Sequence, residues 1–288
     1  MSDVKKSKIV LLVFIVLAII MSALLIVNAV INNRVFVTEY EFSHPDIPSA
    51  FDGCKFMVLS DLHEADFVNQ IVKHIKNEDP EFLLLVGDMV QLPWSTAEKA
   101  LSIAEVCESI GVPVYGVSGN HERQCGRYDE LVDEFWAGDI YLLENGSVKV
   151  EKDGESILLV GIKDPRHDIV TKQKAQVIRR NIGYELSKQE DMFSILLSHR
   201  ANLYPEIKDT GVDLIVSGHM HGGIIRLPFV GGIIGENEEG ELFPRYEYGV
   251  VKEDDSATMI VSGGCDDNPN KRRFFNPPEV LLITLKGE

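Results

Sequence analysis

Five short segments of this chain each end an apolar run with side chains that commonly bind metal ions. They are Asp61-Leu62-His63, Gly87-Asp88, Gly119-Asn120-His121-Glu122, Ser198-His199 and Gly218-His219-Met220-His221. Each segment is common in proteins when it occurs singly. Together and in this order they indicate a pocket for two divalent cations, an arrangement suited to the hydrolysis of phosphate esters.

The side chains in these segments offer oxygen and nitrogen ligands and no thiolate. A set of this kind suits Mn, Fe, Zn or Co. The carboxylate of Asp88 has two oxygens and can bridge two ions, whereas Asn120 offers a neutral amide oxygen. The candidate metal ligands are Asp61, His63, Asp88, Asn120, His199, His219 and His221. His121 need not be a ligand, and we expect it to act as a general acid that protonates the leaving oxygen.

The charge of such a site favours a phosphate substrate. Two divalent cations bring four positive charges, Asp61 and Asp88 remove two, and a hydroxide between the ions leaves about one. Two ions roughly 3.5–4 Å apart lower the pKa of the water between them and place it opposite the attacked phosphorus. The sequence therefore predicts attack by a metal-activated hydroxide.

Strand-like and helix-like segments alternate along the chain. The apolar runs predict strands over 56–59, 82–86, 114–117, 157–161, 193–197, 214–216, 258–261 and 280–285. Helical spacing and end signals predict helices over 67–76, 96–110 (with Ser95 as the N-cap), 128–136, 171–181 and 202–208. Alternation of this kind implies mainly parallel sheets with helices outside, and ligands bind at the carboxyl ends of such strands. Every candidate segment follows a predicted strand.

The region Ile9 to Ile31 is almost wholly apolar and carries no charge. As a helix it is roughly 35 Å long, enough to cross the ~30 Å hydrocarbon core of a bilayer. Lys5, Lys6 and Lys8 precede it, so we expect residues 1–8 to be cytoplasmic and the rest of the chain to be extracytoplasmic. The alternative is a cleaved signal peptide, for which Val27-Asn28-Ala29 has suitably small residues.

The net charge and the cysteine content of the chain bear on its possible partners and on disulfide bonding. The net charge of the chain is −17, and residues 1–31 hold three lysines and one aspartate, so the rest of the chain carries about −19. This argues against nucleic acid as a partner. The four cysteines show no zinc-finger spacing. Cys107 is expected in the core. For the other three cysteines there are two alternatives, one disulfide bond between two of them or free thiols throughout. The oligomeric state is unknown at this point.

The combined motif resembles that of the calcineurin-like metallophosphoesterases, over about residues 54–286. The resemblance implies an α/β (α+β) fold of two packed mixed β-sheets flanked by helices, an αββα sandwich, here preceded by one N-terminal transmembrane helix. It also implies two metal sites that share Asp88. Asp61, His63, Asp88 and His221 would hold one ion, and Asp88, Asn120, His199 and His219 the other. His121 would be the catalytic acid.

The apolar anchor, the stretch from His219 to Phe229 and the tail 273–279 resemble the membrane-associated bacterial phosphodiesterases. Some of those enzymes cleave the pyrophosphate of UDP-2,3-diacylglucosamine, so the resemblance implies a phosphate ester that is nucleotide-linked or lipid. Arg226, Arg272 and Arg273 are expected either to contact substrate or to form surface salt bridges. The run Ile224 to Ile234 is expected either to meet the membrane or to form a buried hairpin.

These observations predict four regions: a cytoplasmic N-terminus (1–8), a transmembrane anchor (9–31), a juxtamembrane connector (32–52) and a metallophosphoesterase domain (53–288). The expected activity is hydrolysis of a phosphodiester or pyrophosphate bond. Two alternatives stay open, a phosphomonoesterase acting on proteins or nucleotides and a metal-binding surface protein without turnover.

Overall fold

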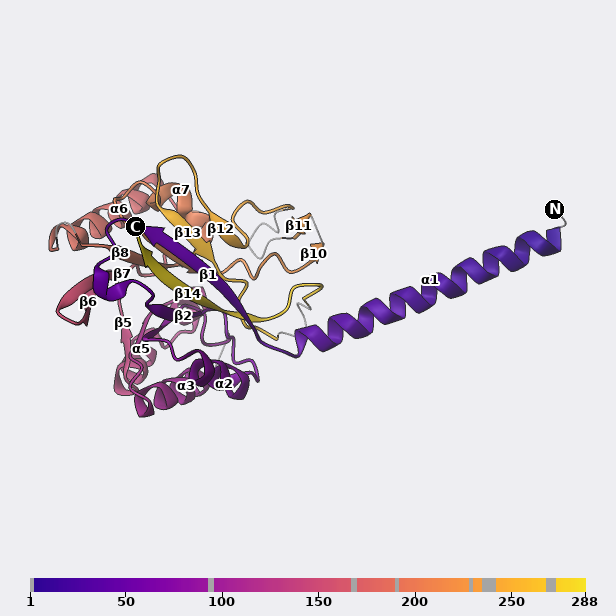
Figure 1. The fold of residues 1–288 in the computed structure, drawn as a ribbon, viewed down its shortest axis with the longest axis horizontal. Coiled ribbons are helices and arrows are strands. Elements are labelled where there is room, and N and C mark those ends of the chain that lie inside the picture. Colours follow the sequence, from indigo (N-terminus) through magenta and orange to yellow (C-terminus); the bar gives the residue numbers. More distant parts are fainter. Residues whose placement is uncertain are drawn as a thin grey trace.

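The computed structural model describes residues 3–92, 96–166, 170–189, 192–227, 230–234, 242–267 and 273–288. A single long helix leads into a domain in which two six-stranded sheets pack face to face (Figure 1). Ser95, Arg272 and the acidic residues between 235 and 241 lie outside the described residues, as do Pro228 and Phe229.

The first sheet has the strand order β1-β14-β2-β3-β4-β5. Its strands are β1 (Phe36–His44), β14 (Glu279–Gly287), β2 (Lys55–Leu59), β3 (Phe82–Val86), β4 (Val114–Val117) and β5 (Ile140–Leu142). Pairing is parallel except between β14 and β2. The sheet is therefore mixed, with a parallel half from β2 to β5 in which the carboxyl ends of the strands meet at one edge.

The second sheet has the order β12-β13-β9-β8-β7-β6. Its strands are β12 (Gly249–Val251), β13 (Thr258–Val261), β9 (Leu214–Gly218), β8 (Ser194–Arg200), β7 (Glu155–Gly161) and β6 (Gly146–Lys152). The four central strands are parallel, and both edge strands are antiparallel to their neighbours. A separate hairpin joins β10 (Arg226–Leu227) and β11 (Gly231–Gly232).

Helices cover the outer faces of both sheets, so that the domain has four layers (Figure 1). The helices are α1 (Asp3–Asn32), α2 (Val68–Glu78), α3 (Glu98–Ser109), α4 (Asn120–Gln124), α5 (Tyr128–Ala137), α6 (Lys172–Ser187) and α7 (Tyr204–Ile207), with short 3-10 turns at Ser49–Phe51 and Ala201–Leu203. The helices α2, α3 and α5 pack on the first sheet, and α6 and α7 on the second. The expected αββα sandwich is confirmed.

The core between the sheets is built from apolar strand residues. It includes Phe56, Val58, Leu84 and Val86 from the first sheet, packed against Ile195 and other residues of the second. Because central parallel strands are buried on both faces, they read in the sequence as continuous apolar runs. That is why the sequence predicts β2, β3, β8 and β9 well.

Four strands, β1, β5, β6 and β12, lie outside the strands and the hairpin expected from the sequence, and they are the edge strands of the two sheets. Phe36–His44 lies within the predicted connector 32–52, yet it forms β1 and pairs with β14 along its whole length. Along β1, exposed residues largely alternate with residues that are half-buried or buried, as expected of an edge strand. In the second sheet, the edge strand β6 is also polar and half-exposed, and no apolar run indicates it. Edge strands bury little of their surface, so their apolar signal is weak.

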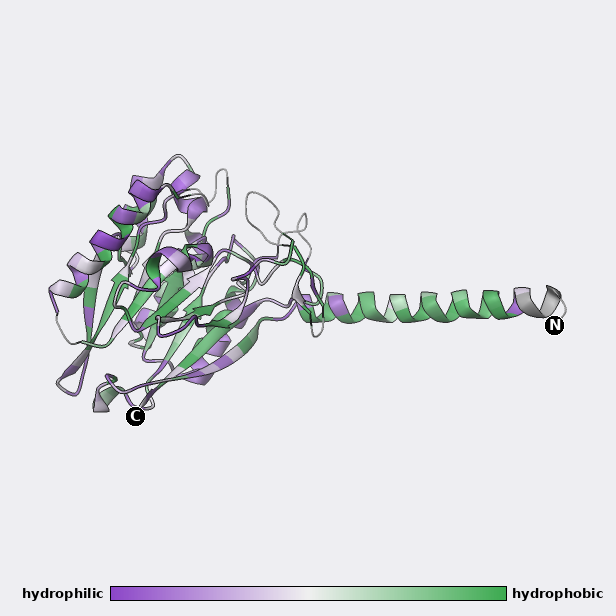
Figure 2. Cartoon of the chain, turned by 90° about the horizontal axis from the view of Figure 1, so that it is seen from above, coloured by the Kyte–Doolittle hydropathy of each residue, from purple (hydrophilic) through white to green (hydrophobic). Residues whose placement is uncertain are grey.

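The helix α1 projects away from the domain, and its apolar residues are exposed along its length (Figure 2). The part suited to span a membrane runs from Ser7 to Asn32, which is 26 residues. Such a helix is consistent with a membrane anchor or with a signal peptide.

All four cysteines are buried, and none forms a disulfide bond, which agrees with the alternative of free thiols.

Candidate metal centre

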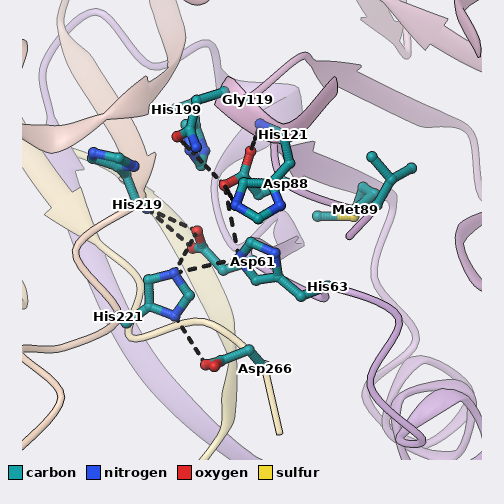
Figure 3. A network of polar contacts seen from close by, with 12 residues as sticks. Asp61, His63, Asp88, Met89, Gly119, His121, His199, His219, His221 and Asp266 are labelled. Atoms are coloured by element: carbon teal, nitrogen blue, oxygen red, sulfur yellow. Dashed lines mark hydrogen bonds and ion pairs between the residues drawn. The ribbon is translucent and has the colours of Figure 1, made fainter. Parts of the chain in front are cut away.

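The predicted ligands come together where strands of both sheets end. Asp61 follows β2, Asp88 follows β3, and Asn120 begins α4 directly after β4. From the second sheet, His199 lies near the end of β8, and His219 follows β9. The site is thus a product of sheet packing, because it needs the ends of both sheets to meet (Figure 3).

The backbone at five of these residues is left-handed. The φ angles are 52° at Asp61, 45° at His63, 54° at Asp88, 73° at His219 and 48° at His221. A residue with a Cβ seldom adopts this conformation, and such outliers cluster at functional sites. The sharp turns let Asp61 and His63 face the same point, which they could not do in a strand.

Close packing also positions His199. A Cβ on Gly87 would lie 2.5 Å from His199 Nδ1, so only glycine fits there. The pairing of β8 with β9 is irregular between Leu197 and Arg200. An irregularity of this kind re-aims a strand side chain, and here it brings His199 toward Asp88.

One cluster of ligand atoms contains Asp61, His63 and His221. The Nε2 atoms of His63 and His221 are 3.3 Å apart, and His221 Nε2 is 3.6 Å from Asp61 Oδ1. The Nδ1 of His63 is buried without a hydrogen-bond partner among the described residues. Two ring nitrogens and a carboxylate oxygen that converge in this way suit a divalent cation.

A second cluster contains Asp88, His199 and His219. The Nε2 of His199 lies 3.4 Å from Asp88 Oδ2 and 3.1 Å from Asn120 Oδ1. The same Asp88 oxygen is 3.7 Å from His63 Nε2. Asp88 therefore stands between the two clusters, as expected of a bridging carboxylate, and the residues present fit two cations.

Hydrogen bonds at Nδ1 separate the histidines into two kinds. His199 Nδ1 contacts the Val86 carbonyl at 2.9 Å, and His221 Nδ1 contacts Asp266 Oδ1 at 2.9 Å. An acceptor at Nδ1 holds the proton there and leaves the Nε2 lone pair free to bind a metal. In His121 the roles are reversed, because the Leu92 N–H donates to Nδ1 at 3.2 Å. The proton of a neutral His121 then lies on Nε2, 3.9 Å from Asp88 Oδ2.

Burial and neighbouring charge set the protonation of these rings. Burial lowers the pKa of His63 to about 3 and also lowers the pKa of His121. Burial acts in the same direction on His199, but the charge of Asp88 outweighs it and raises the pKa of His199 to about 10. A cation that binds His199 therefore competes with a proton.

Glu122 is a functional residue whose role the sequence did not reveal. Its buried carboxylate accepts hydrogen bonds from four backbone N–H groups, those of Asp88, Met89, Val90 and Gly119. Burial and the neighbouring Asp88 charge raise the pKa of Glu122 to about 7. The carboxylate joins the turn after β3 to the turn after β4, so it fixes the spacing between Asp88 and Asn120.

Asp266 is a second such residue, and it holds His221. Its Oδ1 accepts from His221 Nδ1 and from Arg273 Nε at 2.7 Å. Burial raises the pKa of Asp266, but the Arg273 guanidinium and the His221 ring outweigh it and hold that pKa well below its usual range. On the other side of the site, Arg200 pairs with Asp164 at 2.7 Å and contacts His219 Nε2 at 3.0 Å. Only the folded structure brings these pairs together.

Two of the three candidate arginines, Arg226 and Arg273, lie among the described residues, and both have partners within the protein. Arg226 lies over the Tyr248 ring at 4.1 Å and is 3.8 Å from Glu247. Arg273 is buried against Asp266. Arg226 therefore agrees with the expected surface salt bridge, whereas the ion pair of Arg273 is buried inside the domain.

Asp266→Ala is expected to weaken metal binding by about 10–100-fold, the usual effect of removing a carboxylate that orients a ligand histidine. The reason is that His221 would lose the acceptor that fixes its ring. Titration of the metal-free protein with Mn²⁺, followed by calorimetry, measures the change. Asp267→Ala is the matched control, because Asp267 accepts from the Asp66 N–H instead. Equal affinities in the two variants would contradict the role of Asp266.

Residues 54–223 match the family model of the calcineurin-like phosphoesterases. The chain is 28% identical to the uncharacterized metallophosphoesterase YkuE of Bacillus subtilis, over 87% of this chain and 85% of that protein. It is 26% identical to phosphodiesterase YaeI of Escherichia coli, over 62% of this chain and 64% of that protein. Among solved structures, TT1561 of Thermus thermophilus aligns with a TM-score of 0.48 at 12% identity, covering 74% of this chain and 90% of that one.

Proposed function

The chain belongs to the calcineurin-like phosphoesterase family, and on that premise we propose that it is a membrane-anchored enzyme with two metal ions that hydrolyses a phosphodiester or pyrophosphate bond. The observation that carries the proposal is the opposite hydrogen bonding of the histidines. In His199 and His221 an oxygen acceptor occupies Nδ1, so Nε2 is the nitrogen directed at the site and would bind a metal once it has lost its proton, whereas His121 presents an Nε2 proton to the same space.

Each predicted ligand has a place in this proposal. Asp61, His63, Asp88 and His221 would hold one ion, and Asp88, Asn120, His199 and His219 would hold the other. Divalent Mn, Fe, Zn or Co ions bound there would neutralise phosphate charge and lower the pKa of a water molecule between them.

The residues of the chain itself supply positioning and a proton. Glu122 and Asp266 keep Asp88 and His221 in place, so the ligand atoms are arranged before substrate binds. As the proposed acid, His121 would direct its Nε2–H at the oxygen that leaves phosphorus, and this hydrogen bond would stabilise the negative charge that develops on the departing alkoxide or phosphate. The name of the relative YaeI supports a diester rather than a monoester.

The anchor is part of the same proposal. Asn28 and Asn32 of α1 both donate side-chain hydrogen bonds to the Arg273 carbonyl, at 3.1 and 2.5 Å. Cleavage after Ala29 would remove the first of these contacts. The last turn of α1 thus packs as part of the domain, which supports a retained anchor over a signal peptide. Lys5, Lys6 and Lys8 favour an extracytoplasmic domain.

A substrate comparison tests the proposed activity. The full chain in detergent is freed of metal with a chelator, reloaded with each of the four cations, and assayed on bis-p-nitrophenyl phosphate, p-nitrophenyl phosphate and nucleotide-linked pyrophosphates. We expect faster turnover of the diester or pyrophosphate. Faster turnover of the monoester would favour a phosphomonoesterase. Two bound ions without turnover of any ester would favour a non-catalytic metal-binding protein.

A further inference from the structure

Four large apolar side chains are exposed around the β10–β11 hairpin. Leu227 is 39% exposed, Val230 58%, Leu242 66% and Phe243 61%. We call these four residues the apolar edge. Phe243 belongs with the hairpin because its N–H donates to the Ile233 carbonyl at 2.9 Å. Exposed apolar groups gathered in one place usually mark an interaction site.

The apolar edge is connected to the end of α1 through the segment 273–276. The hairpin exchanges backbone hydrogen bonds with Phe274, because Arg226 N donates to Phe274 O at 2.9 Å and Phe274 N donates to Ile224 O at 3.0 Å. The same segment meets α1, where the Phe275 N–H donates to Asn28 Oδ1 at 2.7 Å. Figure 1 shows β10 and β11 at the end of the domain from which α1 leaves.

The length of α1 places this end of the domain at the membrane surface. Its apolar part ends at Asn32, where polar side chains begin. Side chains held beside the end of a spanning helix lie at headgroup depth, where apolar groups insert about 5–10 Å into the boundary with the acyl chains.

We propose that the apolar edge inserts into the bilayer interface beside α1. The occupant of this surface is the lipid bilayer itself, since the surface is continuous with the helix that crosses it. The inference rests on the membrane anchor of the proposed function.

The same connections place the metal cluster next to the membrane. Asn276 Nδ2 donates to the His221 carbonyl at 2.6 Å, and Arg273 holds the Asp266 that orients the His221 ring. His221 is also only a few residues before β10. A phosphate ester at headgroup depth would therefore meet the site without leaving the bilayer.

Fluorescent labels on single introduced cysteines test this proposal. The four native cysteines are buried, so a thiol-reactive NBD dye should label the introduced cysteine selectively. Val230→Cys and Phe243→Cys report on the apolar edge. Val177→Cys is the negative control, on α6 at the far end of the domain, and Ser22→Cys inside α1 is the positive control. The full chain is placed one copy per lipid nanodisc, which excludes burial against a second copy.

Lipids with a doxyl quencher near the headgroup or deep in the acyl chain then report the depth of each label. We expect the shallow quencher to quench the labels at 230 and 243, the deep quencher to quench the label at 22, and neither to affect the label at 177. Labels at 230 and 243 that both stay unquenched, while the label at 22 is quenched, would overturn the proposal and leave the anchor intact. An unquenched label at 22 would show that α1 does not span the bilayer, which would contradict both the membrane anchor and this inference. Ester hydrolysis in the same samples reports separately on the proposed activity.

Discussion

Asp88→Asn is expected to abolish ester hydrolysis and to loosen both metal ions. Among the described residues, Asp88 is the carboxylate that stands between the two clusters, and its Oδ2 lies within 4 Å of His63, His121 and His199. An amide keeps an oxygen that can accept from the backbone N–H of His121, which now donates to Asp88 Oδ1 at 2.8 Å, so the fold should survive. An amide has no charge with which to bridge two cations. Activity should fall toward the uncatalysed rate, roughly 10⁶-fold or more below that of an enzyme.

Metal content and turnover, measured on the same preparation, check this result. Asp79→Asn is the matched control, because Asp79 is an exposed aspartate that also has a left-handed backbone, with φ of 50°. It should keep two ions and full activity. Two tightly bound ions and a normal rate in Asp88→Asn would show that this carboxylate does not bridge.

His121→Ala is expected to keep both ions and to lose about 10²–10⁴-fold in kcat, the usual contribution of a general acid. The structure gives the reason, because the Leu92 N–H faces Nδ1 and leaves the proton of the ring on Nε2. His121→Gln places an N–H group at a similar reach, so it should recover part of the rate on esters that need only a hydrogen bond. Steady-state kinetics at saturating substrate, with metal content measured in parallel, separates kcat from metal loss.

The choice of leaving group sharpens this test. An ester with a good leaving group needs little protonation, so the loss in His121→Ala should be smaller on bis-p-nitrophenyl phosphate than on an alkyl diester. His74→Ala is a suitable control, since His74 bonds the Val35 carbonyl away from the site. A loss of one metal ion in His121→Ala would reassign this histidine as a ligand.

The sequence predicted the parts of this site that depend on strand ends. Buried parallel strands give continuous apolar runs, and a ligand that follows such a run must lie at the carboxyl edge of its sheet. This rule predicts the positions of Asp88 and His219 at the carboxyl edges of their sheets. The family resemblance implied two packed mixed sheets, but no local pattern indicates the strand order, since β14, the last strand, pairs with both β1 and β2.

The residues that support the ligands could not be predicted in this way. Glu122 belongs to the segment Gly119-Asn120-His121-Glu122, but the four N–H groups that its carboxylate binds come from two separate turns. Asp266 lies 45 residues from His221 in sequence. The type of each residue gives no sign of its partner, because the pairing exists only after the sheets have packed.

If the proposed cations bind, the left-handed turns would make the lifetime of the protein depend on the supply of metal. Each such backbone costs about 1–2 kcal/mol for a residue other than glycine, and five lie in one site. Cations that bind only the native chain offset this cost by mass action. When metal is scarce, the unloaded chain should open more often and be degraded sooner. Cellular abundance of the protein would then follow cation availability without any dedicated sensor.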